Sequence, residues 1–498
     1  MKNTASTRIT IAKVTRFLWG MALFTLPVTS FRYFPFMGEG TFVRPLAFYP
    51  LALLLPLLTI QLIRGRTSLP RVGALTPLLG FGLVVLTASS FGAWLDPIPL
   101  RGQEYFDRVV RAWATLIIGL SFFIAAVWMN RNEEELRFSV KWLLAGFVMD
   151  IAWSGVQALA FYTPLLEKVT VTHWQRTFSM RELVRTNRVS GMAYEPAWLA
   201  GQIGTVYLPW LFASVLTGLR VTRIKWLEPV LLGFAALLIL ATYSRGGLLI
   251  AVLASGLTFL LGGMAELRAA WSWFVSGFRR GSNWFLRVGV VVLALGILAG
   301  AAVFLGQKGY ISRLFESDAE SLEEFVVDNS AGARTAYLAS ALGAYEESPL
   351  LGVGLGASGF YMYDHLPDWA LTTVPEIARQ LSPESRLYPN PKNMVARLLA
   401  ETGLIGLILF AAFLFSLLGD ALIALKSGSL FGRYLGMTGL FSWIAIAIYN
   451  LTQDSFATPN LWINLGILAG VTASALESEK ISPASSAGDG GWNKLEQS

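Results

Sequence analysis

Residues 226–263 read WLEPVLLGFAALLILATYSRGGLLIAVLASGLTFLLGG, and Arg245 is the only cation in this stretch. The sequence on both sides of it is almost uniformly apolar. An apolar run of roughly 18 residues is long enough to span a bilayer as a helix. The stretch therefore predicts two membrane helices joined by a turn at Ser244–Gly247. Two interpretations of Arg245 are open: an interfacial guanidinium that extends to the lipid headgroups, or a ligand for an anion.

The same apolar pattern recurs along all 498 residues, of which 54% are hydrophobic and only 14% are charged. Soluble domains carry about 25% charged residues, so we predict an all-α polytopic membrane protein with about twelve transmembrane helices. Cysteine is absent, which excludes disulfide and thiolate chemistry. The predicted spans are 16–36, 44–63, 72–95, 109–130, 142–162, 196–217, 226–243, 246–263, 288–306, 395–418, 434–451 and 459–475.

The distribution of Lys and Arg predicts that both termini are cytoplasmic, because short loops such as 64–71 and 218–225 are dense in cations. The basic start of the chain continues directly into a full-length span, and no cleavable signal peptide is evident. The outer side would nevertheless hold eighteen of the 39 Lys and Arg residues, fifteen of them arginines. Arginine matches phosphate geometry better than lysine does. The outer face is therefore predicted to bind an anion.

Two outer segments are long enough to hold structure, and they set the predicted organisation of the chain. A large extracytoplasmic helical loop between spans 9 and 10 contains a predicted helix at 331–346. Its sequence GLGASG at 354–359 matches GxGxxG, but no strand precedes it, so we interpret it as a turn that packs closely on the membrane domain. The predicted parts are spans 1–9 (1–306, with the outer loop 163–195), the large loop (307–394), spans 10–12 (395–475) and a disordered cytoplasmic tail (476–498).

Several polar residues near the predicted span ends are candidates for an anion site. Ser244 is a good N-cap for the helix that follows it, and Gly246 allows close approach to the backbone, so Arg245 would join a helix N-terminus in binding an anion. Arg185 and Arg188 have no obvious local acidic partner. The outer loop therefore contributes further candidate cations to this site.

Two carboxylates have more than one interpretation. Glu195 precedes Pro196 at the start of the sixth span, where it serves either as a helix cap or as a functional carboxylate. Glu401 lies within an apolar helix, which is costly unless the group is paired inside the bundle, and structural pairing and catalysis are both open. Arg334 lies in the first turn of its predicted helix. A cation is mildly unfavourable there, so a bound anion would explain the presence of this arginine. Lys392 and Asn393 lie at the mouth of the tenth span.

Four motifs, taken in order, resemble the O-antigen ligase and Wzy-type repeat-unit polymerase superfamily. They are RVSGMAYEP at 188–196, TYSRGG at 242–247, NSAGARTAYLASALGAYEESPLLGVGLG at 329–356 and NPKNMVARLLAETGLIG at 390–406. The resemblance implies a GT-C-like glycosyltransferase that takes a glycan from undecaprenyl pyrophosphate at the periplasmic face of the bacterial cytoplasmic membrane. It implies no metal or other cofactor. Family arginines that bind pyrophosphate would fall on Arg188, Arg245 and Arg334.

One position departs from the ligase pattern. The ligases typically begin the last motif with His-Asn, and that histidine is the proposed base; here Lys392 takes its place and Asn393 is kept. A lysine is more naturally a further phosphate contact. We therefore favour a polymerase, with Glu195 as the leading candidate base. The predicted catalytic residues are Glu195, Arg245 and Lys392; Arg185, Arg188, Arg245, Arg334 and Lys392 bind pyrophosphate; Ser244, Gly246, Asn393 and Glu401 support the site.

Two alternatives follow from the same features. An O-antigen ligase would transfer the lipid-linked glycan to a lipid A-core or protein acceptor. A transporter or flippase of an anionic glycolipid would place ionisable residues along several spans, whereas the charges here collect at the outer mouth. The expected partners are the lipid-linked glycan donor, a glycan acceptor and the bilayer, with a chain-length regulator or flippase as further candidates. No nucleic acid is expected.

Overall fold

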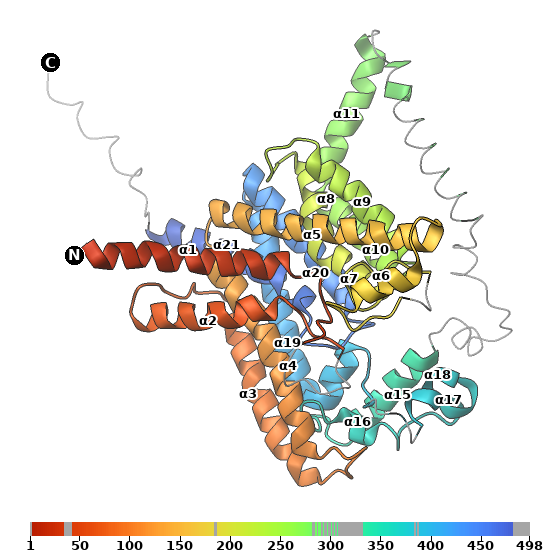
Figure 1. The fold of residues 1–498 in the computed structure, drawn as a ribbon. Coiled ribbons are helices and arrows are strands. Elements are labelled where there is room, and N and C mark those ends of the chain that lie inside the picture. The colour runs from red at the N-terminus through yellow and green to blue at the C-terminus, as the bar shows by residue number, and fades with distance from the viewer. Residues whose placement is uncertain are drawn as a thin grey trace, which may run out of the picture.

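A computed structural model of the chain describes residues 2–33, 42–183, 187–280, 332–382 and 388–481, with residue 385 and single residues between 284 and 306. Every regular element within these residues is a helix (Figure 1), and three isolated bridges are the only β-type pairing there. Seven of the described helices are long and apolar enough to cross a membrane. This confirms the all-helical, multi-pass class.

The seven candidate spans lie at or close to positions predicted from the apolar runs. They are α3 with the turn η1 (Leu75–Leu95), α4 (Tyr105–Met129), α5 (Glu133–Tyr162), the segment Pro196–Thr217, α10 (Arg245–Gly262), α19 (Met394–Lys426) and α20 (Leu430–Tyr449). The segment Pro196–Thr217 contains α7 (Pro196–Gln202), the π-helix η2 (Ile203–Tyr207) and α8 (Leu208–Thr217). The predicted total of about twelve spans stays a prediction.

The remaining helices are shorter, less apolar or outside the bundle. They are α1 (Lys2–Phe24), α2 (Phe48–Ile63), α6 (Lys168–Gln175), α9 (Leu227–Ala241), α11 (Met264–Arg280), α15 (Gly332–Glu346), α16 (Ser358–Tyr361), α17 (Asp368–Thr373), α18 (Pro375–Gln380), the turn η3 (Pro459–Leu461) and α21 (Ile463–Ile481). The predicted helix at 331–346 is confirmed as α15. Most of the predicted span 288–306 lies outside the described residues, as do 307–331 and the tail from 482.

The boundaries of the first predicted span, 16–36, were wrong. Helix α1 begins at Lys2 and ends at Phe24, and the chain turns at Thr25–Pro27. Proline has no amide to donate and disfavours helical backbone in the residue before it, so the apolar run continues past the point where the helix stops. The last predicted span, 459–475, likewise begins with η3 at Pro459, and α21 starts only at Ile463.

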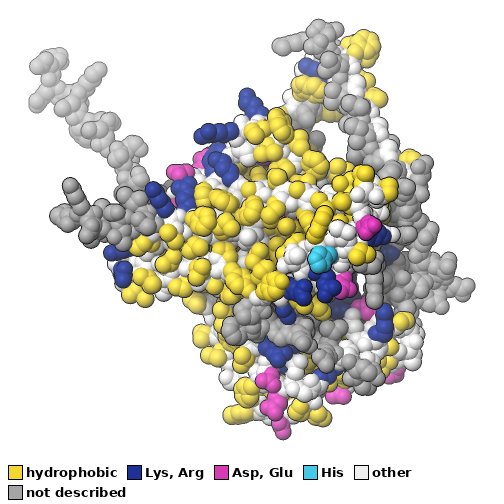
Figure 2. Space-filling model, in the orientation of Figure 1, with side chains coloured by type: hydrophobic (Ala, Val, Ile, Leu, Met, Phe, Trp, Pro, Cys, Tyr) yellow, Lys and Arg dark blue, Asp and Glu magenta, His cyan; other side chains and the backbone are white. Residues whose placement is uncertain are grey.

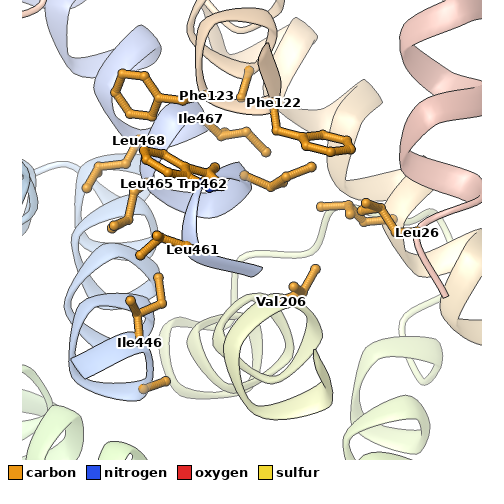
Figure 3. Packing of buried hydrophobic residues seen from close by; sticks show 14 of the residues in the cluster. Leu26, Phe122, Phe123, Val206, Ile446, Leu461, Trp462, Leu465, Ile467 and Leu468 are labelled. Atoms are coloured by element: carbon orange, nitrogen blue, oxygen red, sulfur yellow. The ribbon is translucent and has the colours of Figure 1, made fainter. Parts of the chain in front are cut away.

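Aromatic packing joins the spans at the centre of the bundle (Figure 3). Phe123 of α4 contacts Trp462 edge to face, with ring centroids 6.3 Å apart. Trp462 is fully buried, and its indole N–H donates to the carbonyl of Phe456 at 2.7 Å. A Cβ at Gly119 would overlap this indole, so α4 approaches it through a glycine. The result is that the segment before α21 is fixed against the bundle.

Apolar side chains also cover much of the outside. Hydrophobic residues form a broad band across the face shown in Figure 2, and many of the Lys and Arg side chains in view lie at its margins. On α3 alone, Leu79, Leu83 and Leu86 are more than half exposed. Exposed apolar area on this scale is typical of a surface covered by lipid.

Helix α19 is broken at Gly403, whose backbone angles are φ 63° and ψ −170°. The segment 349–354 pairs with the break. Val353 N–H and Gly354 N–H donate to the carbonyls of residues 400 and 401, at 2.9 and 3.1 Å, and the amides of residues 404 and 405 donate to the carbonyls of residues 349 and 350, at 2.9 and 3.3 Å. Backbone groups freed within a membrane need such partners. The segment 349–354 therefore packs closely on the bundle.

Replacing Gly403 with alanine tests this arrangement. Its backbone lies in a region of φ and ψ that only glycine adopts readily, at a cost of about 1–3 kcal/mol for other residues, and a Cβ would overlap the backbone of Leu350. We expect Gly403→Ala to lower the midpoint of thermal unfolding of the purified protein. Gly419→Ala, in the same helix with open space around its Cβ position, is the control and should leave the midpoint unchanged. Equal midpoints for both variants would contradict this account of the break.

Candidate functional site

The segment that begins at Asn187 packs against the end of α9. Arg188 Nε donates to the carbonyl of Thr242 at 2.8 Å, and Arg188 Nη2 donates to the carbonyl of Tyr243 at 3.1 Å. Val189 N–H donates to the carbonyl of Ala241 at 3.2 Å. The last carbonyls of a helix lack intrahelical partners and carry partial negative charge, which favours a guanidinium there. Two predicted motifs, RVSGMAYEP and TYSRGG, are thereby brought together.

The turn at Ser244–Gly247 starts α10 as predicted. Ser244 Oγ accepts a hydrogen bond from Gly247 N–H at 3.2 Å, which confirms the N-cap. Arg245 is the first helical residue and is exposed. A Cβ at Gly246 would meet open space, whereas one at Gly247 would overlap Ala200 of α7. Close approach therefore occurs at Gly247, and it packs the first turns of α10 against α7.

Glu195 stands at the N-cap position of α7, before Pro196, but its carboxylate makes no capping hydrogen bond. That carboxylate makes no hydrogen bond or ion pair with any residue that the structure describes. Burial raises the pKa of the neighbouring Tyr194 phenol, the charge of Glu195 raises it further, and Arg181 lowers it. The guanidinium carbon of Arg181 lies 5.7 Å from the centre of the Tyr194 ring. The Glu195 side chain thus does not cap α7, which was one of its two interpretations.

Lys392 and Arg334 form a second group of cations. Lys392 Nζ lies 3.1 Å from Glu376 Oε1 and 3.1 Å from Gln380 Oε1, both on α18, and 4.8 Å from the ring centre of Tyr337. Arg334 lies one turn before Tyr337 on α15. Its side chain is exposed and has no ion pair or hydrogen bond with any residue in the described part of the chain. Helices α15 to α18 gather in one part of the molecule (Figure 1).

The end of α20 and the loop after it lie between the two groups of cations. On one side, Asp454 Oδ2 accepts from Lys392 N–H at 3.0 Å and the carbonyl of Asn450 accepts from Met394 N–H at 2.8 Å. On the other side, a Cβ at Gly201 of α7 would overlap the Tyr449 ring. A small pocket opens here, lined by Thr29, Val43, Pro45, Trp198, Tyr449, Thr458, Pro459 and Asn460. No described contact joins Arg334 directly to Arg188 or Arg245.

Glu401 is paired inside the bundle. Its carboxylate accepts from Arg397 Nε at 2.9 Å and from Ser358 Oγ at 2.9 Å, and the side chains of Arg397 and Glu401 are only 12% and 3% exposed. Arg397 Nη1 also donates to the carbonyl of Asp454 at 2.6 Å. Burial raises the pKa of the Asp454 carboxyl, and the Arg397 guanidinium opposes that rise. These contacts agree with structural pairing, one of the two interpretations of Glu401.

Sequence reasoning missed Arg397, although its spacing of four residues from Glu401 is the usual signal for a helical ion pair. Asn393 caps α19: its Oδ1 accepts from Ala396 N–H at 3.0 Å, and its Nδ2 donates to the carbonyl of Leu451 at 3.2 Å. Arg185 lies outside the described residues. Within the described ranges there is no group of three or more His, Cys, Asp or Glu side chains with the arrangement of a metal site.

Comparison with protein families adds one finding to this geometry. Residues 230–411 match the O-antigen ligase family model. The match confirms the resemblance to the O-antigen ligase and Wzy-type superfamily. A comparison with curated proteins gives no match. The matched region, residues 230–411, extends from within α9 to beyond the break in α19, so it includes Arg245, Arg334 and Lys392, whereas Arg188 and Glu195 precede it. A function in joining lipid-linked glycans is supported at this level.

Removing one partner of the buried ion pair between Arg397 and Glu401 should lower the stability of the protein. Glu401→Leu would leave Arg397 charged and unpaired by a carboxylate in the bundle, and such losses cost about 3–5 kcal/mol. We expect a strong fall in the thermal unfolding midpoint. The double variant Arg397→Met with Glu401→Leu removes both charges and should recover part of that loss. A single variant as stable as the natural chain would show that the pair does not hold the fold.

Proposed function

We propose that the protein polymerises oligosaccharide repeat units carried on undecaprenyl pyrophosphate, at the outer face of the bacterial cytoplasmic membrane. The match to the O-antigen ligase family over residues 230–411 supports the general class, a transfer of lipid-linked glycan. One observation carries the proposal further: Glu195 precedes α7 and Arg245 begins α10, these two helices pack through Ala200 and Gly247, and Arg188 binds the carbonyls just before α10.

Two features of the region where α10 begins favour binding of a pyrophosphate. The unpaired amides at the N-terminus of α10 and the positive end of its dipole attract anions, and α7 packs against the first turn of α10. Arg188 is exposed but held by the carbonyls of Thr242 and Tyr243, so its guanidinium is oriented before any substrate arrives. Preorganised cations often contribute more than any other effect to stabilising the charge that develops during a reaction.

The step that we propose is a displacement at the anomeric carbon of the donor glycan. A hydroxyl oxygen of the acceptor glycan forms a bond to that carbon, and the bond from the carbon to the pyrophosphate oxygen breaks. The electron pair leaves with undecaprenyl pyrophosphate, whose charge Arg188 and Arg245 stabilise. The Glu195 carboxylate takes the proton of the attacking hydroxyl, which requires a base with free oxygen atoms. Inversion at the anomeric carbon is expected by analogy with the family.

An O-antigen ligase is the second candidate, favoured by the description of the matched family. It would use the same donor chemistry and a lipid or protein acceptor. Lys392 supports the polymerase, because its side chain is held by Glu376 and Gln380 at the position where the ligases have their proposed base. Cells lacking a polymerase would accumulate single repeat units, whereas cells lacking a ligase would accumulate long unattached chains.

Reconstitution of the purified protein with a lipid-pyrophosphate-linked repeat unit as the only substrate tests the proposal. We expect a ladder of polymers on a gel. Arg245→Ala should slow it on the order of 10²-fold, corresponding to about 3 kcal/mol from one charge-assisted contact. Arg66→Ala is the control, because this exposed arginine follows α2 at the end away from Thr29 and Tyr194. Transfer only after a lipid or protein acceptor is added would indicate the ligase instead.

Glu195→Gln tests proton transfer by Glu195 separately from binding of the donor pyrophosphate. It keeps the shape of the side chain and removes the proton acceptor, so we expect elongation to fall roughly 10²–10⁴-fold with little change in donor binding. Glu182→Gln is the matched control: this exposed carboxylate in the same loop lies 3.6 Å from Arg176. Initial rates and donor KM would be measured for both. Normal elongation by Glu195→Gln would exclude Glu195 as the base.

A further inference from the structure

The short segment 190–192 lies between Arg188 and Glu195 and is held by side chains of α5. Gln157 Oε1 accepts from the amides of Ser190 and Gly191, at 3.0 and 2.9 Å, and Asp150 Oδ1 accepts from the amide of Met192 at 2.8 Å. Asp150 and Gln157 are both completely buried. Two side chains from a candidate membrane span thus bind three consecutive amides of the loop that carries the proposed base.

A second layer of hydrogen bonds fixes the Gln157 amide in one orientation. Gln157 Nε2 donates to the carbonyl of Gly191 at 2.7 Å and to Gln175 Oε1 at 3.2 Å. Gln175 Oε1 also accepts from the indole N–H of Trp153. The glycine is required because Gly191 has φ +56° and a Cβ would overlap Asp150 Oδ1. The donor and acceptor groups of the Gln157 amide are therefore both paired, and the loop packs directly on the polar face of α5.

The two ends of the loop have their own anchors. Arg188 and Val189 bind the carbonyls at the end of α9, and Tyr194 N–H donates to Thr29 Oγ1 at 3.0 Å. Without the contacts to α5, the middle of the loop would keep only these ends and the hydrogen bond from Gln175 Nε2 to the carbonyl of Gly191, at 3.3 Å. Asp150 binds nearer to Glu195 along the chain, and Gln157 binds nearer to Arg188. Polar groups buried within a membrane span are costly and generally serve function.

We propose that Asp150 and Gln157 are positioning residues for glycan transfer, holding segment 190–192 so that Glu195 and Arg188 keep a fixed separation at the starts of α7 and α10. This inference rests on the proposed function. It assigns neither residue a contact with substrate. A misplacement of about 1 Å at a reacting group can cost 10²-fold in rate, so the contacts on α5 set the reaction rate through the loop.

The two positions predict opposite outcomes for isosteric changes. Asp150→Asn keeps Oδ1 for the Met192 amide and replaces Oδ2, a buried atom with no hydrogen-bond partner among the described residues. Gln157→Glu keeps the acceptor for two amides but places an oxygen against the carbonyl of Gly191. We expect Asp150→Asn to remain active and Gln157→Glu to be impaired. Asp150→Ala should also be impaired, because no acceptor remains for the Met192 amide.

Kinetics of the full-length chain in proteoliposomes, with the lipid-pyrophosphate-linked repeat unit as probe, tests this. Asp150→Ala should lower kcat on the order of 10²-fold with a smaller change in donor KM, because it releases the Glu195 side of the loop. Gln157→Glu should also raise KM. Asp150→Asn should stay within a few-fold of the natural chain. Natural kcat in folded Asp150→Ala, or equal impairment of Asp150→Asn and Asp150→Ala, would overturn the proposal.

Hydrogen exchange separates failure of this inference from failure of the proposed function. The amide of Met192 should exchange slowly in the natural chain and in Asp150→Asn, and faster in Asp150→Ala. The amides of Ser190 and Gly191 should exchange faster in Gln157→Glu. If the natural chain shows no turnover, the proposed function fails, and this exchange pattern still decides whether α5 holds the loop. Unchanged exchange in the alanine variant would overturn the positioning role.

Discussion

The requirement that backbone groups be paired inside a membrane explains how residues 349–358 pack on the bundle. Breaking α19 at Gly403 frees amides and carbonyls that lipid cannot satisfy, at several kcal/mol for each unpaired group. The segment 349–354 supplies the partners. Its position then fixes the chain on either side of it: α15 before the segment, and Ser358, which donates to Glu401, after it. A local backbone break thus places a whole loop region against the bundle.

Buried charge reinforces the same junction. Arg397 and Glu401 lie on the first half of α19, and Arg397 also binds the carbonyl of Asp454, whose carboxylate accepts the amide of Lys392. Lys392 has a left-handed backbone with φ 51°, which is uncommon in residues other than glycine. Its amide donates to Asp454 and its side chain pairs with Glu376, and these contacts hold the residue in place. The network therefore connects the start of α19, the loop after α20 and the ion pair of Lys392 with Glu376. The position of Lys392 depends on that connection.

Local signals in the sequence were enough for some of these features and not for others. Ser244 as an N-cap and α15 at Gly332–Glu346 follow from caps and periodicity, which act over a few residues. The break at Gly403 could not be predicted, because its cause is a partner segment about fifty residues earlier in the chain, and an isolated glycine in an apolar helix is common in membranes. Glu195 was predictable as an N-cap position, but its carboxylate does not cap.

The polar face of α5 could not be predicted from the sequence, for a related reason. Asp150 and Gln157 lie in an apolar run whose sequence gives no sign of what they bind, since their partners are main-chain amides of a distant loop. Backbone amides have no sequence signature apart from glycine, and only Gly191 marks the place. Two kinds of interaction therefore build the proposed site. Arginine and glutamate side chains supply the charge, which composition reveals, and buried polar side chains set the distances between those charges, which only the folded chain reveals.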